Sequence, residues 1–130
     1  MLTLIIPGKP FAKQRPRMTR QGRAYTPAAT VSFERTVAEY ALAAGAVATT
    51  DPVAVIIRAY FEPPPSWSKK RRAASIGAPH IQRPDLDNIE KAILDGLNRI
   101  AFADDGQVAA LSSRKWWADE ARTEVEVRAI

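Results

Sequence analysis

An amphipathic segment between Leu86 and Ile100 sets the strongest limit on the fold. Its apolar side chains recur every three or four residues, so they line one face of a predicted helix: Leu86, Ile89, Ile93, Leu94, Leu97 and Ile100. A helix with a single apolar face must bury that face against another element. The fold therefore needs a second layer, and the strands predicted on either side of this helix in the sequence can provide it.

Four further segments have the length and pattern of β-strands. They are short apolar or alternating runs that end at proline, glycine or polar residues: 2–6, 52–61, 107–117 and 123–130. A second helix begins at Thr26-Pro27 and ends at Gly45, because proline suits the first helical position and glycine follows the last one. The predicted order is β-α-β-α-β-β, an α+β fold in which a mixed sheet packs against helices in two layers. We expect one domain from 130 residues.

Two basic segments interrupt this pattern. Residues 9–27 contain several prolines and no acid, which predicts an extended arm or an irregular hairpin outside the core. Residues 66–84 form a long basic loop, with one helical turn expected near 69–74. The cations of both segments are candidate contacts to the phosphates of a nucleic acid: Lys9, Lys13, Arg15, Arg17, Arg20 and Arg23, then Lys69, Lys70, Arg71, Arg72 and Arg83.

The composition excludes several classes of protein. The chain has no cysteine, so a disulfide scaffold, a thiolate nucleophile and a cysteine-based zinc site are excluded. Its net charge is +5. No apolar run reaches the ~18 residues of a membrane-spanning helix, and the first residues lack the pattern of a signal peptide. We therefore expect a cytoplasmic protein with no membrane partner, whose pI of about 9.9 suits a nucleic-acid partner.

The acidic residues around the helix predicted from Leu86 are the candidate reactive groups. Asp85 and Asp87 stand at its beginning, Lys91 follows Asp87 by one turn, and Asp104-Asp105 come after its end. In a structural interpretation, Asp85 caps the helix, Asp87 opposes the helix dipole and Lys91 pairs with Asp87. In a functional interpretation, the carboxylates hold Mg²⁺ for a cut in a nucleic-acid backbone. Asp105 reaches the other acids only if the chain folds back or a second subunit supplies it.

Other residues near these segments have structural explanations. Glu90 and Asp95 are expected to be surface charges, and His80 an ordinary loop residue. Trp67, beside a proline run, is expected to pack locally rather than to stack on a base. Trp116 and Trp117 should point to opposite faces of a strand, so that one of them enters the core.

Three motifs carry a resemblance to a known family: Arg83–Ala92 (RPDLDNIEKA), Leu94–Asn98 (LDGLN) and Ala101–Val108 (AFADDGQV). Three N-terminal segments add to it: Pro7–Pro10, Lys13–Arg17 and Tyr25–Pro27. On these motifs the chain resembles, over nearly its whole length, the RusA family of Holliday junction resolvases, in particular its phage and prophage branch.

The resemblance implies a homodimeric, Mg²⁺-dependent endonuclease, with Mn²⁺ as a substitute metal. Such an enzyme binds four-way DNA junctions and resolves them by paired symmetric nicks in DNA recombination and repair. By position, the catalytic and metal-binding carboxylates fall on Asp85, Asp87 and Asp105, with Asp104 as a further candidate ligand, and the catalytic lysine falls on Lys91. The resemblance also implies the cytoplasm of a bacterial or phage-infected cell, in association with the nucleoid.

Two other functions fit the same residues. A flap or replication-fork nuclease would use the same site on other branched DNA. A regulatory or architectural DNA-binding module would keep the acids for structural reasons alone, and it would bind branched DNA without a metal and without cutting it.

Overall fold

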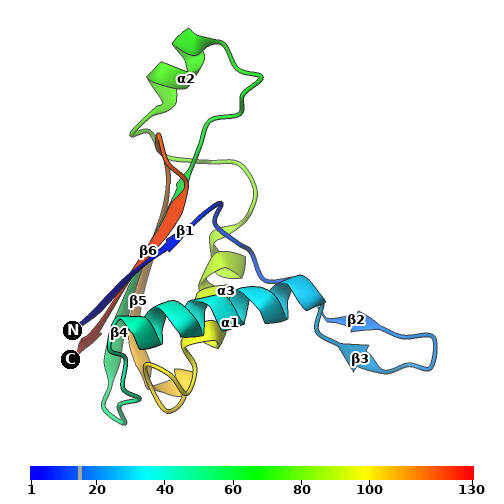
Figure 1. Ribbon diagram of the computed structural model, residues 1–130, viewed down its shortest axis with the longest axis vertical. Helices are drawn as coiled ribbons and strands as arrows, with labels where there is room; N and C mark the ends of the chain where they lie inside the picture. The colour runs from blue at the N-terminus through cyan, green and yellow to red at the C-terminus, as the bar shows by residue number, and fades with distance from the viewer. Residues whose placement is uncertain (15) are drawn as a thin grey trace.

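The computed structural model describes residues 1–14 and 16–130, and of Arg17 only the main chain. Arg15 and the Arg17 side chain, both predicted DNA contacts, lie outside the described part. Figure 1 shows the elements, which follow in chain order: β1 (Leu2–Pro7), β2 (Arg17–Met18), β3 (Ala24–Tyr25), α1 (Ala28–Ala43), β4 (Val53–Phe61), α2 (Lys69–Ser75), α3 (Leu86–Leu97), the 3-10 helix η1 (Asp105–Gln107), β5 (Val108–Trp117) and β6 (Arg122–Ala129).

The main sheet has four strands in the order β1-β6-β4-β5. β6 pairs antiparallel with both β1 and β4, whereas β5 pairs parallel with β4. Side chains of β4 are alternately buried and half-buried along its whole length, as expected for a central strand with one face in the core. The predicted α+β fold with a mixed sheet is confirmed.

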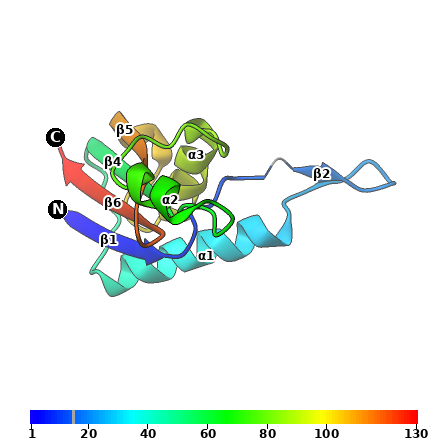
Figure 2. The same ribbon diagram turned by 90° about the horizontal axis from the view of Figure 1, so that it is seen from above.

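Helices α1 and α3 cover one face of this sheet, with α1 over β1 and α3 over β5. Figure 2 shows both helices on the same side of the strands. The core lies between the two layers and is almost entirely apolar; its largest fully buried apolar side chains include Phe102, Ile57, Ile89, Ile93 and Leu97. The apolar stripe of α3 therefore fills the core as its spacing predicts. The helix ends at Leu97 rather than Ile100, because Asn98 is extended and Arg99 has a positive φ of 69°.

The two helices approach each other closely at Gly96. A Cβ atom at this position would lie 2.6 Å from Cβ of Val37, which is shorter than any normal contact. Only glycine leaves room for the side chain of Val37 here, so α3 can rest directly on α1. This contact sets the distance between α3 and α1, and it thereby positions the acidic residues at the beginning of α3.

Two basic projections extend from this core (Figure 1). The first is the hairpin of β2 and β3, in which Arg17 pairs with Tyr25 and Met18 with Ala24. The second is α2, at the end of β4 and β5, where one helical turn was predicted. The arm predicted over 9–27 is thus partly a hairpin. Within the described residues, no helix has the length and apolar character to cross a membrane.

Candidate active site

The two acids at the beginning of α3 are both exposed and only one of them serves the helix. Asp85 occupies the N-cap position with extended backbone angles, yet its side chain makes no capping hydrogen bond. Asp87 accepts a hydrogen bond of 3.0 Å at Oδ1 from the main-chain N–H of Asn88. Asp85 therefore takes the predicted N-cap position, but its carboxylate does not cap the helix. Among the described residues it has no ion-pair partner, which suits it to bind a ligand.

The loop in front of Asp85 is held from the neighbouring strand β5. Lys115 Nζ donates hydrogen bonds to the main-chain oxygens of Gln82, at 2.6 Å, and Pro84, at 2.8 Å. A charged donor to two carbonyls fixes the loop more firmly than neutral contacts would. Lys115 thereby positions the main chain on both sides of Arg83, directly before Asp85.

His80 anchors the same loop in the core and is not an ordinary loop residue. Its side chain is 5% exposed, stacks on Phe61 with ring centroids 4.0 Å apart, and lies against Trp117 at 4.4 Å. The main-chain N–H of His80 donates to the main-chain oxygen of Lys115 at 3.0 Å. Burial, and then the nearby charge of Lys115, lowers the pKa of His80 below its ordinary value. A neutral, packed imidazole is suited to support rather than to proton transfer.

A groove lies between this loop and the chain that follows β1. It is lined by Lys9, Phe11, Gln14, Arg83, Asp85 and Asn88, and it has a volume of about 670 Å³. Two cations and a carboxylate that does not cap its own helix therefore face the same space. Cations hold DNA phosphates, and a carboxylate is a ligand for a hard metal ion. The groove combines the two chemistries that hydrolysis of a phosphodiester requires.

Lys91 lies between the two ends of the acidic constellation. Its Nζ is 3.2 Å from Oδ1 of Asp95 and 4.0 Å from Oδ2 of Asp105. Among the ion pairs of the described residues, its partners are these two acids and not Asp87. The structure thus brings Lys91 and Asp105 together across α3 and η1, which the sequence could not establish.

Asp104 has a structural task. Its Oδ2 accepts a hydrogen bond of 2.9 Å from the N–H of Gly106, and the Gln107 side chain accepts from the N–H of Asp104 at 2.8 Å. This reciprocal pair is a capping box for η1. It orients the turn that carries Asp105, so Asp104 supports the site whether or not it also binds metal.

The three predicted metal ligands do not form a compact group. Asp85 and Asp87 stand at the beginning of α3, whereas Asp105 lies in η1, 4.0 Å from Nζ of Lys91 one helical turn further along. No group of three or more His, Cys, Asp or Glu side chains within the described part of the chain is close enough to hold an ion. Carboxylate oxygens are nevertheless the donors that Mg²⁺ prefers. Their assembly around one ion stays a prediction.

Asp95 and Glu90 are more engaged than the sequence analysis expected. The Asp95 side chain is 16% exposed and binds both Lys91 and Lys13. Glu90 accepts a hydrogen bond of 2.7 Å from the hydroxyl of Ser113 on β5. The prediction that both are plain surface charges is therefore wrong. In the sequence, only the spacing of four residues between Lys91 and Asp95 indicated this ion pair. Asp87, four residues before Lys91, has the same spacing, so the sequence could not distinguish the two aspartates as partners of Lys91.

Lys13 connects the root of the basic arm to the helices. Its ammonium binds Asp95 and lies 3.2 Å from Oε1 of Glu34. The main-chain N–H of Lys13 donates to the main-chain oxygen of Asn88 at 2.9 Å. Burial acts to lower the pKa of Lys13, but the hydrogen bonds and charges of Asp95 and Glu34 outweigh it and raise that pKa. Its predicted contact with DNA stays a prediction, made less direct by these partners.

The remaining predicted DNA contacts lie on the two projections. Arg20 and Arg23 are exposed at the turn of the hairpin, and the four cations of α2 are exposed as well. The guanidinium of Arg71 lies 3.7 Å above the ring of Trp67, which packs against Trp117 in turn. Trp67 therefore packs locally, as expected, and Trp117 is the tryptophan that enters the core.

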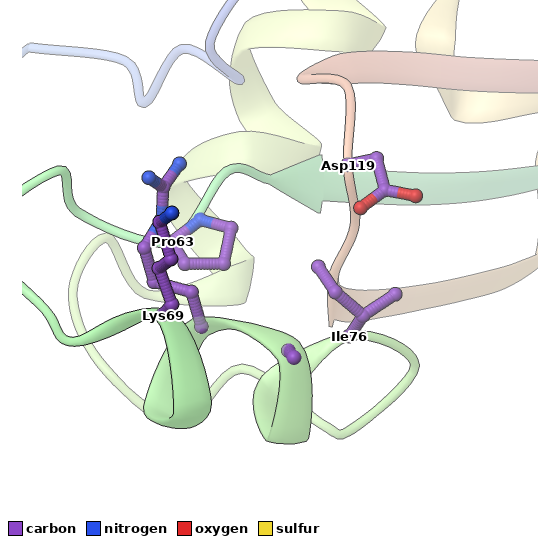
Figure 3. A pocket seen from close by; sticks show the side chains of 6 residues that line it. Pro63, Lys69, Ile76 and Asp119 are labelled. Carbon is purple, nitrogen blue, oxygen red and sulfur yellow. The ribbon is translucent and has the colours of Figure 1, made fainter.

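A small hollow of about 200 Å³ separates the base of α2 from the turn between β5 and β6. Figure 3 shows Pro63, Lys69, Ile76 and Asp119 around it. The chain that follows α2 is tied to β5, because the main-chain N–H of Gly77 donates to the main-chain oxygen of Trp117 at 2.9 Å. The cations of α2 are thus presented on a supported helix rather than on a free loop.

Comparison with known proteins is consistent with this arrangement. The family described as endodeoxyribonuclease RusA matches residues 7–128, nearly the whole chain. The chain belongs to the RusA family. The Bacillus subtilis (strain 168) protein described as "Uncharacterized protein YqaN" is 34% identical over 131 residues, a match that covers 95% of this chain and 92% of YqaN. Membership in the RusA family supports a nuclease that cuts within DNA chains, with DNA as its partner.

Proposed function

We propose that this RusA-family chain is a Mg²⁺-dependent endonuclease that acts as a homodimer and resolves four-way DNA junctions by paired nicks. The observation that carries the proposal is the groove in which Lys9 and Arg83 stand beside Asp85, whose carboxylate does not cap α3. A four-way junction has a pseudo-twofold axis, which suits a dimer with two equivalent sites.

The residues of the site have separate tasks in this proposal. Asp85, Asp87 and Asp105 would hold Mg²⁺, which when bound supplies an activated water and polarises the phosphate. Lys9 and Arg83 hold the phosphates that flank the scissile bond in the groove. Lys91, already beside Asp105 at 4.0 Å, places its ammonium where negative charge develops on the phosphate oxygens. Lys115 keeps the Asp85 loop in place.

Within the described residues the three carboxylates are not grouped closely enough to hold one ion, so the proposal includes a step that assembles them. Asp105 is brought to Asp85 and Asp87 by a shift of η1 on binding DNA and metal, or it acts from the second subunit. In both cases Asp105 starts 4.0 Å from Lys91 of its own chain, so we propose that Lys91 and Asp105 move as a pair.

The test uses purified protein, Mg²⁺ and end-labelled DNA: a mobile four-way junction, a flap, a three-way fork and a linear duplex. We expect paired symmetric nicks in the junction alone. Asp87→Asn should abolish cutting and keep junction binding, because it removes a metal ligand and leaves the basic groups. Glu39→Gln, also a change from acid to amide but at an exposed site of α1, should cut normally.

Other outcomes would point to other functions. Preferential cleavage of the flap or the fork would assign a nuclease for those structures with the same residues. Tight junction binding with no cutting in Mg²⁺ or Mn²⁺ would assign a DNA-binding module whose acids are structural.

A further inference from the structure

A line of alternating charges crosses four segments of the molecule. It runs from Glu34 on α1 to Lys13 in the arm, then to Asp95 and Lys91 on α3, and ends at Asp105 in η1. Each oxygen of the Asp95 carboxylate is bound by a different lysine: Lys91 at Oδ1 and Lys13 at Oδ2. Asp95 is thus the central member that connects the arm with the end of the line at η1.

The two ends of this line differ in exposure. The side chains of Lys13, Asp95 and Glu34 are 22%, 16% and 28% exposed, whereas Lys91 and Asp105 are 57% and 39% exposed. Water screens the inner contacts less than the outer ones, so the inner contacts hold their geometry more firmly. The inner end therefore acts as an anchor, and the outer end is accessible to a substrate.

From this geometry we infer that Asp95, held by Lys13, is the residue that positions Lys91 for cleavage. The inference rests on the proposed function, in which Lys91 acts on the scissile phosphate. A lysine side chain has high rotamer entropy, and an unheld ammonium spends much of its time away from any one place. Asp95 limits Lys91 to positions that also face Asp105. Lys13 keeps Asp95 from turning toward solvent.

The test separates binding from cleavage. Single-turnover rates are measured with the four-way junction saturated by protein in Mg²⁺, and dissociation constants are measured without a divalent metal. Asp95→Asn keeps the shape of the side chain and removes its charge. We expect it to slow cleavage of bound junction at least tenfold and to change the dissociation constant less than threefold. Asp95→Glu, which restores the carboxylate, should recover part of the rate. Glu39→Gln, an equal loss of charge at an exposed site of α1, should match the wild type.

A role through Lys91 has a specific signature. In a Lys91→Ala background the Asp95→Asn change should cause no further loss, because the residue that it positions is gone. A wild-type cleavage rate in folded Asp95→Asn, or an equal loss in both backgrounds, would overturn the inference. If Asp95→Asn does not fold, Lys13→Gln is tested in the same two backgrounds. The same changes in the cleavage rate of saturated junction are then expected, and the same rates would refute the inference. Failure of the wild-type protein itself to cut any DNA would instead refute the proposed function.

Discussion

Gly96 offers the sharpest test of the packing that supports the site. In Gly96→Ala the new Cβ would stand 2.6 Å from Cβ and 2.8 Å from Cγ1 of Val37. Both atoms belong to a short, buried side chain on a helix, so neither can turn away and α3 must move. Overpacking of this kind costs about 1–3 kcal/mol. Alanine recovers about 0.5–1 kcal/mol through its better helix propensity, and less than that near the helix end.

The net loss is therefore about 0.5–2.5 kcal/mol of unfolding free energy, which lowers Tm by roughly 2–9 °C in a domain of this size. Urea unfolding followed by tryptophan fluorescence measures the loss directly, since Trp117 lies in the core. The control is Val37→Ala, alone and combined with Gly96→Ala. It removes the Cγ atoms at 2.8 and 3.2 Å but keeps the Cβ at 2.6 Å, so the combined loss should be only slightly less than the sum. Unchanged or raised stability in Gly96→Ala would show that α1 and α3 do not meet as closely as described.

Three further results are expected. The free energy of unfolding should fall as the pH decreases below about 6.5, the usual pKa of histidine, because the folded state lowers the pKa of His80 and the unfolded chain then binds the extra proton. His80→Phe should make this pH dependence, measured as the urea midpoint, shallower. An identical pH dependence in the variant would contradict the burial of His80. Arg20→Ala with Arg23→Ala should weaken junction binding and lower the slope of log K against log salt concentration by about 1.8, or 0.9 per lost phosphate contact. Arg128→Ala, on β6 and outside both projections, should leave this slope unchanged. Equal slopes in the wild type and both variants would exclude the hairpin from the interface. Lys115→Met removes the hydrogen bonds to the main-chain oxygens of Gln82 and Pro84 and destabilises the loop before Asp85 by roughly 1 kcal/mol. Cleavage of bound junction should therefore slow by about tenfold or less. A normal rate would show that the loop keeps its position without Lys115.

The elements of this fold follow from local patterns and could be predicted. Alternation along 123–130 and the helical stripe beginning at Leu86 depend only on neighbouring residues, and both elements formed where expected. The strand order did not follow from the sequence. β6 lies between β1 and β4, because buried faces choose partners among all strands and no local pattern records that choice.

The site was predictable as a set of residues and less so as a set of contacts. Lys91 has an aspartate four residues away on each side, and the sequence suggested Asp87. The structure pairs it with Asp95, since Lys13, 82 residues earlier in the chain, holds that carboxylate in place. A contact over such a separation leaves no trace in spacing. For the same reason, the burial of His80 between Phe61 and Trp117 was missed.

The two basic projections point away from the core in different directions, the hairpin beyond the start of α1 and α2 beyond the ends of β4 and β5 (Figure 1). A ligand that touches both gains a chelate advantage, because the first contact raises the effective concentration of the second. A straight duplex laid along one projection forgoes that advantage, whereas DNA arms that diverge from a branch point can engage both at once. Selectivity for branched DNA would then come from the distance between two weak contacts, and it would vanish if either projection were removed, even with the catalytic groups intact.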